Sequence, residues 1–593
     1  MTSKKEIKVL SEREHILLRP TVYVGSVNLS EEKTPIIKEG KIFIEQRSIS
    51  VGMYKLFDEV FSNSLDEAKR MKGKMKKITI EVDTKKNMIR ITDTGDGFYK
   101  GSEINSKSGK SNIETAVSQL RAGSNFENDD VKESLVGTNG MGVSLVNVLS
   151  EYFSIKTTNA STTYSQEWYD FKRVEPKVIS KRGAKGTTVE FIPLPKIFYN
   201  SKWDKEILFS TLVLKQELIK RDEEISKLKL DFLWDGGKID LNVDFLPKDS
   251  HKIDTPIGQL TIWEKYEGSG SLSFVNSAMC TGIHQKITND FINDKLDDTL
   301  GHHFYDTLLV LNLPPILVKF GDQNKTKYVT TREEIEGTLT SKFGGKIVGF
   351  FKTDLFNRIL KKVEERKNEG YVKKLRSEKR KVNLKNSHKY FPAQKRDAQN
   401  LFVVEGLSAM GSILQKRDPR NDGVYALKGK IKNCKNIGDL SSNREIVEIM
   451  QILGLDPMVK SPDINGYDRI VIATDPDPDG AHITSLIINL FYKWFPQVIQ
   501  TGKLSLLRIP LVTTGVGKNR KYYWTMDEFK KSSSRSSVRY LKGLGSLSLE
   551  DWEWVMGNKK MIEIKETEES SDYLEMAFGS SSEARRKWLS DSL

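Results

Sequence analysis

The sequence predicts an α/β protein built from several domains, and three observations support this. The chain has 593 residues, about four times what one compact domain needs, so we expect three or four domains. Residues 77–82 and 88–92 alternate polar and apolar side chains, which predicts an antiparallel pair of strands. Two apolar runs at 401–404 and 469–474, each followed by a helical pattern, predict a parallel sheet.

Composition excludes several classes of function. Lys and Arg outnumber Asp and Glu to give a net charge of +14 and a pI of about 9.2, which favours nucleic acid or an anionic membrane surface as a partner. The two cysteines, Cys280 and Cys434, make neither a disulfide framework nor a Cys-ligated zinc site. Because no apolar run reaches the roughly 20 residues of a membrane span, and the first residues lack a signal-peptide core, we expect a soluble intracellular protein.

Residues 361–389 form a segment of different character. Twelve basic residues stand against four acidic ones there, and apolar residues are sparse. This pattern predicts a helical or extended connector, either a solvated linker or a segment that contacts phosphates.

Residues 53–72 predict an amphipathic helix, because apolar side chains recur at i, i+3, i+4, i+7 and i+8. Glu59, Asn63 and Asp66 share the opposite side of this helix. Taken alone, that side is an ordinary solvated face.

Two glycine-rich segments follow. The second predicted strand runs into Asp93-Thr-Gly-Asp-Gly97, where glycines let the backbone approach a ligand and the carboxylate accepts from an exocyclic amine. Residues 137–142, Gly-Thr-Asn-Gly-Met-Gly, open a helix at 144–149, and free N–H groups at a helix start attract anions. Each segment alone could be a simple turn.

Together these motifs resemble the ATPase superfamily shared by gyrase, certain heat-shock chaperones, histidine kinases and the MutL repair proteins. A fourth motif, Gly186-Thr-Thr-Val-Glu-Phe191, completes the resemblance. It implies that Glu59 is the general base that activates water, that Asn63 holds Mg²⁺, and that Asp93, supported by Thr187, reads the adenine of ATP. It also assigns the following residues to the nucleotide site: Gly97, Ser124, Asn125, Gly137, Thr138, Asn139, Gly140, Met141, Gly142 and Val143.

Two further segments resemble type IIA DNA topoisomerases. Residues 14–26 are similar to an N-terminal arm that crosses to a second protomer when ATP binds, which implies self-association of the ATPase domain. The loop 320–325 resembles the Q-T-K loop of the transducer domain, although the middle residue is Asn324 here. The resemblance implies that Gln323 and Asn324 help to bind ATP and that Lys325 contacts the γ-phosphate, where it supplies positive charge during transfer.

Acidic residues follow both predicted strands of the later domain. Glu405 ends the first strand, and Asp475, Asp477 and Asp479 follow the second. The carboxyl ends of parallel strands meet at one sheet edge, and crowded carboxylates repel one another unless a divalent cation compensates. The alternative is an acidic turn that caps the following helix. An EF-hand is excluded, because Leu486 stands where the bidentate Glu belongs.

This pattern resembles the TOPRIM metal-binding domain of topoisomerases. The resemblance implies that Glu405, Asp475 and Asp477 bind Mg²⁺ with help from Asp479, and that Glu405 is catalytic. Leu407 replaces the usual second acidic residue and cannot be a ligand. Three lysines in further signatures are expected to contact DNA phosphates: Lys428, Lys430 and Lys542.

The resemblance covers nearly the whole chain, and the large subunits of T-even-like phages are expected to be the nearest relatives. A winged-helix domain with the DNA-cleaving tyrosine is not recognisable, so we expect it on a separate subunit. The expected activity is ATP-dependent passage of one DNA duplex through another in the cytoplasm of a bacterial host, with ATP and Mg²⁺ as cofactors. One alternative is an ATP-driven DNA clamp or chaperone that does not cleave DNA, and a second is a non-enzymatic basic DNA-binding scaffold.

Five regions are expected. They are an α/β sandwich ATPase of the Bergerat type with its arm at 1–195, an α+β transducer domain at 196–360, a basic connector at 361–395, a TOPRIM parallel-sheet domain at 396–515, and a C-terminal tail at 516–593.

Overall fold

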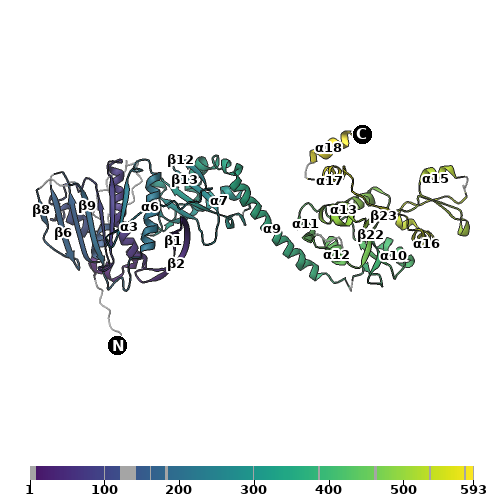
Figure 1. Ribbon diagram of the computed structural model, residues 1–593, viewed down its shortest axis with the longest axis horizontal. Coiled ribbons are helices and arrows are strands. Elements are labelled where there is room, and N and C mark those ends of the chain that lie inside the picture. Colours follow the sequence, from purple (N-terminus) through teal and green to yellow (C-terminus); the bar gives the residue numbers. More distant parts are fainter. Residues whose placement is uncertain are drawn as a thin grey trace, which may run out of the picture. The chain divides into compact units, whose positions relative to one another are not determined.

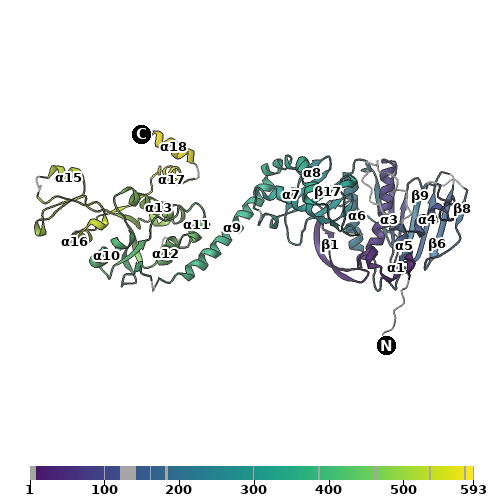
Figure 2. The same ribbon diagram turned by 180° about the vertical axis from the view of Figure 1, so that it is seen from behind.

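The computed structural model describes residues 9–98, 100–120, 142–160, 162–180, 184–297, 299–322, 324–384, 387–459, 464–532, 536–579 and 582–591. The chain divides into two compact units, an N-terminal unit of residues Met1–Val363 and a C-terminal unit of residues Glu364–Leu593. Figures 1 and 2 show both units from opposite sides.

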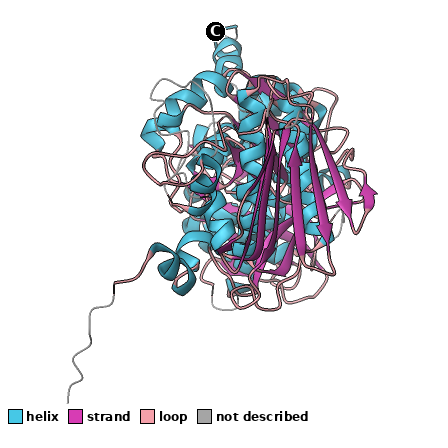
Figure 3. Cartoon of the chain, turned by 90° about the vertical axis from the view of Figure 1, so that its left-hand side faces the viewer, coloured by secondary structure: helices cyan, strands magenta, loops and turns pink. Residues whose placement is uncertain are grey.

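A nine-stranded sheet is the centre of the N-terminal unit, in the order β11-β10-β3-β4-β9-β5-β6-β7 with β8 beside β6. Its strands lie side by side in one layer (Figure 3). The expected antiparallel pair is confirmed, because β3 pairs with β4 from Ile78 opposite Asp93 to Asp83 opposite Met88. The strands are β3 (Lys77–Asp83), β4 (Met88–Asp93), β5 (Ser150–Thr158), β6 (Thr163–Tyr169), β7 (Lys172–Arg173), β8 (Lys177–Ile179), β9 (Gly186–Pro193), β10 (Lys229–Trp234) and β11 (Gly237–Ile239).

Helix α3 (Val51–Arg70) packs against this sheet. Its apolar side chains, among them Leu56, Phe57 and Phe61, are buried in the same core as the strands, as the helical spacing predicted. Ser50 caps the helix by accepting from the N–H of Met53. The other helices of this layer are α1 (Glu12–Leu18), α2 (Thr21–Val24), α4 (Asn112–Ser118), α5 (Gly142–Val148) and α6 (Lys205–Arg221), and a hairpin is formed by β1 (Ser30–Lys38) and β2 (Lys41–Ile49).

A second, five-stranded sheet in the order β12-β13-β17-β14-β15 follows in the same unit. Its central strand, β17 (Tyr305–Leu311), is buried throughout. Strands β16 and β18 form a short parallel pair, and residues 324–325 lie just before β18. The elements are β12 (His251–Thr255), β13 (Gly258–Glu264), β14 (Leu272–Val275), β15 (Ala278–Met279), β16 (Thr281–Gly282), α7 (Ile283–Asn293), η1 (Gly301–His303), β17 (Tyr305–Leu311), η2 (Pro315–Leu317), β18 (Lys327–Tyr328), α8 (Arg332–Leu339), η3 (Thr340–Gly344) and η4 (Ile347–Lys352).

The basic connector is largely helical. Helix α9 (Asp354–Lys381) begins before the connector and continues into it. Ile359 and Val363 are buried in the core of the N-terminal unit, while Val372 and Leu375 are buried in that of the C-terminal unit. These few apolar residues therefore anchor the first part of the helix in one core and its later part in the other.

The C-terminal unit contains a six-stranded sheet in the order β19-β21-β20-β22-β23-β27. Strand β20 is parallel to β21 and to β22, which confirms the predicted parallel pair. Successive residues of β20 enter different cores, Val403 one and Val404 the other, because side chains alternate across a strand. The sheet is thus covered on both faces.

The remaining elements of this unit surround that sheet. They are β19 (Tyr390–Phe391), β20 (Ala398–Glu405), α10 (Gly406–Lys416), β21 (Asp422–Leu427), α11 (Ile437–Ser442), α12 (Arg444–Leu453), β22 (Tyr467–Ala473), α13 (Pro478–Trp494), α14 (Pro496–Gln500), β23 (Leu504–Leu507), β24 (Val512–Thr514), η6 (Gly517–Asn519), β25 (Lys521–Tyr523), α15 (Met526–Lys531), β26 (Arg539–Tyr540), η7 (Leu544–Ser546), α16 (Leu549–Asn558), β27 (Met561–Glu563), α17 (Ser570–Phe578) and α18 (Ser582–Asp591).

The five expected regions stay predictions. The boundary at 360/361 lies within α9. The boundary at 515/516 separates β24 from β25, with which it pairs, and β27 of the expected tail pairs with β23 of the six-stranded sheet.

Candidate functional site

Asp93 ends strand β4 and is almost fully buried. One carboxylate oxygen accepts from the N–H groups of Gly95 (2.9 Å) and Thr187 (3.1 Å), and the other accepts from the hydroxyl of Ser64 (3.1 Å). Burial raises the pKa of Asp93, and these hydrogen bonds oppose the rise. The carboxylate is therefore held rigidly at the end of the strand, as recognition of one nucleobase requires.

Two glycines allow the backbone to close around Asp93. Gly97 has φ +72°, and a side chain there would collide with the carbonyl of Thr158. A side chain at Gly186 would collide with the carbonyl of Asp93 itself. The hydroxyl of Thr187 lies 3.1 Å from that of Thr157, so the expected adenine-site residues Asp93, Gly97 and Thr187 are gathered at one place.

Glu59 lies on α3 with only 14% of its side chain exposed. Its carboxylate forms an ion pair of 2.7 Å with Lys55, one turn earlier. A Cβ added at Gly142, the first residue of α5, would lie 3.0 Å from Cδ of Glu59 and closer still to its carboxylate. The end of the glycine-rich segment thus lies directly against the expected general base, while Asn63 is exposed one turn further along.

Lys325 lies close to the same helix. Its backbone is left-handed, with φ +59°, and its side chain experiences the charges of Glu59, Lys55 and Asp58. Burial lowers the pKa of Lys325, while the acidic neighbours oppose that effect. The neighbouring Asn324 contacts the N-terminal segment, since its side-chain amide occupies the space that a Cβ at Gly25 would need.

Val143 packs against the core of the sheet. The other expected nucleotide contacts lie outside the described residues, and they are Ser124, Asn125, Gly137, Thr138, Asn139, Gly140, Met141 and Gln323.

A second group of polar residues lies at the carboxyl edge of the six-stranded sheet. Glu405 ends β20, and Asp475 follows the adjacent parallel strand β22. The N–H of Asp475 donates to Glu405 over 3.2 Å, and a carboxylate oxygen of Asp475 accepts from the N–H of Leu544 over 2.7 Å. Burial raises the pKa of Glu405, and the negative charges of three aspartates after β22 raise it further.

The other two aspartates have partners of their own. Asp477 caps α13 by accepting from the N–H of Gly480 over 2.7 Å, as the alternative interpretation of this segment supposes. Asp479 pairs with Lys430 over 2.8 Å, which lowers the pKa of Asp479. Lys428 and Lys542 are exposed.

The donor chemistry of this edge suits Mg²⁺, because its carboxylate oxygens are hard ligands and their mutual repulsion would be relieved by a cation. Among the described residues, no three His, Cys, Asp or Glu side chains are already arranged around a common ion position. Leu407, which replaces the usual acidic residue, is half exposed on α10.

Sequence reasoning missed several partners of these residues. Lys55 could have been found, since it stands four residues before Glu59 on a predicted helix. Ser64, which bonds Asp93, faces the sheet from the same helix. The contact of Gly543 and Leu544 with Asp475 spans about 70 residues and has no local signal.

Two segments match known domain families. Residues 49–196 match the histidine kinase-, DNA gyrase B- and HSP90-like ATPase family, and residues 400–509 match the Toprim domain family. The chain thus combines a multidomain α/β fold of gyrase B-like ATPase type with a Toprim domain.

Along nearly its full length the chain is homologous to components of type II topoisomerases. It is 28% identical to the B subunit of DNA gyrase from Thermotoga maritima, over 99% of this chain and 98% of the relative. It is 26% identical to the B subunit of DNA topoisomerase 4 from Mycoplasma pneumoniae, over 99% and 98%. With DNA topoisomerase 2 of Candida albicans it shares 29% identity, over 98% of this chain and 44% of that protein.

Solved structures show the same fold for part of the chain. The ATPase region of Saccharomyces cerevisiae topoisomerase II, bound to ICRF-187, has a TM-score of 0.50 and 23% identity, covering 60% of this chain and 99% of that one. The expectation that phage proteins are the nearest relatives stays a prediction. In the described parts of the chain, no helix is both long and apolar enough to cross a bilayer.

Proposed function

We propose that this chain is the ATP-hydrolysing, Mg²⁺-binding subunit of a type II DNA topoisomerase. It would pass one duplex through a transient break in another, together with a separate subunit that carries the cleaving tyrosine. One observation carries the proposal: the N-terminal unit gathers Glu59, Asp93 and Lys325 around one helix and strand, and the C-terminal unit gathers Glu405 and Asp475 at one sheet edge.

In ATP hydrolysis, each side chain of the N-terminal unit has a definite task. Asp93 accepts from the adenine amine, and Thr187 supports it. Glu59 accepts a proton from the attacking water, a role that suits a carboxylate whose orientation is held by an ion pair with Lys55. Lys325 stabilises negative charge on the γ-phosphate as the bond to the leaving group breaks. Asn63 supplies an oxygen ligand for the Mg²⁺ that accompanies ATP.

In DNA cleavage, the sheet edge of the C-terminal unit holds the scissile phosphate. Glu405, Asp475 and Asp477 would hold Mg²⁺, with Asp479 assisting, and the ion would supply charge stabilisation to the leaving oxygen. A cation there would replace the cap made by Asp477 and the pair between Asp479 and Lys430. Three exposed lysines bind the flanking phosphates: Lys428, Lys430 and Lys542.

The topoisomerase proposal includes closure of two copies of the N-terminal unit on ATP. In the single chain, Arg13 of α1 donates to the carbonyl of Asp170 over 3.0 Å and lies over the ring of Phe171. Helix α1, which carries the first residues of the expected arm, therefore docks on its own unit, and exchange between protomers would break these contacts.

The test measures two activities in the complex with the tyrosine-bearing subunit. Glu59→Gln should abolish ATP hydrolysis and ATP-dependent relaxation of supercoiled DNA, whereas Glu333→Gln, an exposed substitution on α8, should not. Asp475→Asn should abolish relaxation but keep ATP hydrolysis, and exposed Asp572→Asn on α17 is its control.

A DNA clamp or chaperone without cleavage is the second candidate, supported by the same ATPase site. It predicts that Asp475→Asn changes nothing. Relaxation that persists at the normal rate in either test variant would contradict the topoisomerase proposal.

A further inference from the structure

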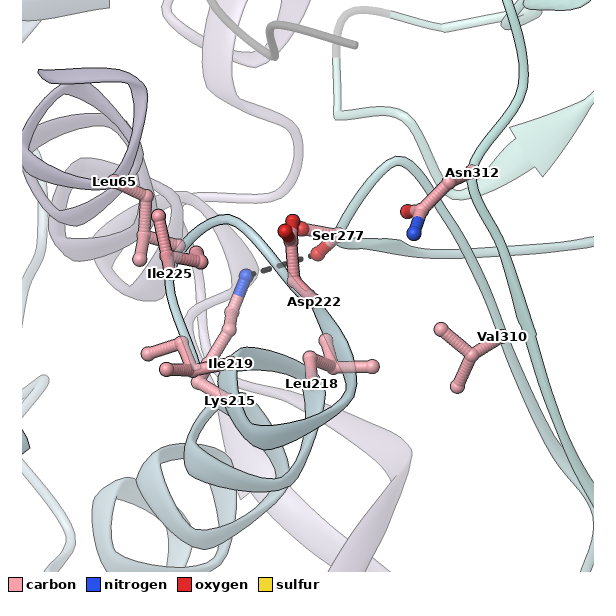
Figure 4. Close-up of a pocket in the computed structure, with 9 residues that line it drawn as sticks. All are labelled: Leu65, Lys215, Leu218, Ile219, Asp222, Ile225, Ser277, Val310 and Asn312. Atoms are coloured by element: carbon pink, nitrogen blue, oxygen red, sulfur yellow. Dashed lines mark hydrogen bonds between the residues drawn. The ribbon is translucent and has the colours of Figure 1, made fainter. Parts of the chain in front are cut away.

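Lys215 is a charged side chain inside the N-terminal unit. It lies on α6 with 8% of its side chain exposed. Its ammonium group donates to a carboxylate oxygen of Asp58 over 2.9 Å. It also donates to the backbone carbonyl of Ser277 over 3.1 Å, the bond drawn in Figure 4. Because a buried ammonium is costly unless it is paired, these two bonds fix where α3, α6 and the turn at Ser277 meet.

The space beside Lys215 is too small to be a ligand site. It measures about 10 Å³, which is room for one water at most. Most of its lining is aliphatic, with Leu65, Leu218 and Val310 among the residues drawn in Figure 4. The charge of Lys215 thus serves its protein partners and not a bound molecule.

On the α3 side, Lys215 begins a chain of alternating charges that ends at Glu59. Lys215 bonds Asp58 at 2.9 Å, Asp58 lies 3.8 Å from Lys55, and Lys55 pairs with Glu59 at 2.7 Å. Burial alone would raise the pKa of Asp58, but the charges of Lys215 and Lys55 lower it to about 2. Asp58 therefore stays ionised and places a negative charge beside Lys55.

On the other side, Lys215 holds a tight turn. Asn276 and Ser277 both have left-handed backbones, with φ +48° and +69°, as a two-residue hairpin loop between the paired residues Val275 and Ala278 requires. The side-chain amide of Asn276 accepts from the N–H of Leu313 over 2.7 Å and donates to its carbonyl over 2.9 Å. The turn is therefore rigid and has few alternative positions.

That turn leads directly to the loop of Lys325. Strands β15 and β16 follow Ser277. Strand β16 pairs in parallel with β18, so that Thr281 of β16 lies opposite Lys327 of β18. The N–H of Thr281 donates to the carbonyl of Thr326 over 2.9 Å. One path of contacts therefore runs from the expected general base through Lys215 to β18, the strand that follows the Lys325 loop. The side chain of Lys325 returns to the charges around Glu59.

We propose that Lys215 is a positioning residue for ATP hydrolysis, which fixes Glu59 on α3 relative to the Lys325 loop through its bonds to Asp58 and Ser277. The inference rests on the function proposed above. Lys215 does not touch the nucleotide, so its removal should affect turnover and not nucleotide affinity.

The test compares Lys215→Met with Lys220→Met, an exposed substitution on the same helix. Lys215→Met should lower kcat for ATP hydrolysis by about tenfold, a part of the 10²–10⁴-fold that a positioned general base supplies. The affinity for a non-hydrolysable ATP analogue should stay within about twofold, because the adenine contacts are untouched. Lys220→Met should match the unmodified chain in both measurements.

Two further variants separate positioning from simple loss of stability. Asp58→Asn should also reduce kcat, and the double variant should be no slower than Lys215→Met, since Lys215→Met already removes the contact with Asp58. Lys215→Arg keeps the charge and should recover most of the rate. If Lys215→Met does not fold, Asp58→Asn and Lys215→Arg give the same comparison.

The outcomes distinguish this inference from the proposed function. Lack of ATP hydrolysis in the unmodified chain and in Lys220→Met would contradict the proposed function itself. Normal kcat in folded Lys215→Met or Asp58→Asn, with hydrolysis intact elsewhere, would overturn only the positioning role. Rate losses that add in the double variant would also overturn it.

Discussion

Replacement of Gly543 by alanine should displace Asp475 without touching the ATPase site. A Cβ at Gly543 would lie 2.9 Å from Cγ of Asp475 and 2.9 and 3.0 Å from its two oxygens, whereas ordinary contact begins near 3.4 Å. The carboxyl group must therefore retreat by about 0.5 Å, and the 2.7 Å bond from the N–H of Leu544 must lengthen or break. Because Asp475 has a short side chain, this movement shifts the whole carboxylate.

A shift of this size matters if Asp475 holds a cation for DNA cleavage. Misplacement by about 1 Å can cost about 100-fold in rate, so a shift of half that size should reduce DNA relaxation by about tenfold. ATP hydrolysis should be unchanged, because Glu59 and Asp93 lie in the other unit.

The assay is relaxation of supercoiled DNA by the complex with the tyrosine-bearing subunit, with ATP hydrolysis measured in the same samples. Gly545→Ala is the matched control, since a Cβ at Gly545 meets no atom within 4 Å. Equal relaxation rates for the Gly543→Ala and Gly545→Ala variants would refute the reasoning, as would loss of ATP hydrolysis in the Gly543→Ala variant alone.

Three other predictions concern separate sites. Gly142→Ala should push the carboxylate of Glu59 aside and lower kcat for ATP hydrolysis. Gly337→Ala on α8, where a Cβ meets nothing within 4 Å, should not lower it. Equal kcat values for these two variants would contradict the contact between Gly142 and Glu59. Burial lowers the pKa of Lys325, so its charge, and with it ATP turnover, should decline as pH rises through a value below that of an exposed lysine. Lys325→Arg should remove this alkaline decline from the pH profile of kcat, because arginine stays protonated, and superimposable profiles would exclude the role. Asp551 is buried and accepts from Arg520, among other donors, so Asp551→Ala should cost about 3–5 kcal/mol in the free energy of unfolding. Against the effect of burial, hydrogen bonds from Ser548 and Tyr522 help to lower the pKa of Asp551, so this stabilisation is present above the ordinary aspartate pKa and is lost as pH falls. Urea unfolding of the Asp551→Ala variant and of exposed Asp527→Ala at several pH values measures the loss of stability and its pH dependence.

Local patterns in the sequence predict the elements that carry the sites. The alternation in β3 and β4 and the helical spacing of α3 depend on which face is buried, and both are visible in a window of a few residues. The pairing of β20 with β22, which brings Glu405 to Asp475, follows from the strand–helix order and the geometry of parallel sheets.

Contacts between distant segments are not predictable in this way. Lys215 meets Asp58 across 157 residues, and its partner at Ser277 is a backbone carbonyl, which leaves no trace in the sequence. The charge pattern also does not decide between a helical and an extended connector. Helix α9 depends on a few apolar residues, such as Ile359 and Leu375, that enter two separate cores.

The partners of the carboxylates at the edge of the six-stranded sheet are also only partly predictable from the sequence. The sequence shows four carboxylates near two strand ends and a helix cap as one alternative, but not that Asp477 is the capping residue or that Asp479 pairs with Lys430. Which contacts persist when a cation or DNA binds depends on their relative free energies, and a sequence pattern does not contain that information.

The topology of the DNA product tests the central claim most directly. Single topoisomers of a closed DNA circle are incubated with ATP, Mg²⁺ and the complex of this chain with the tyrosine-bearing subunit, and the linking numbers of the products are resolved by electrophoresis. Passage of a duplex through a double-strand break predicts that the linking number changes only in even steps and only with ATP. Odd steps, or no change of linking number despite active ATP hydrolysis, would contradict the account.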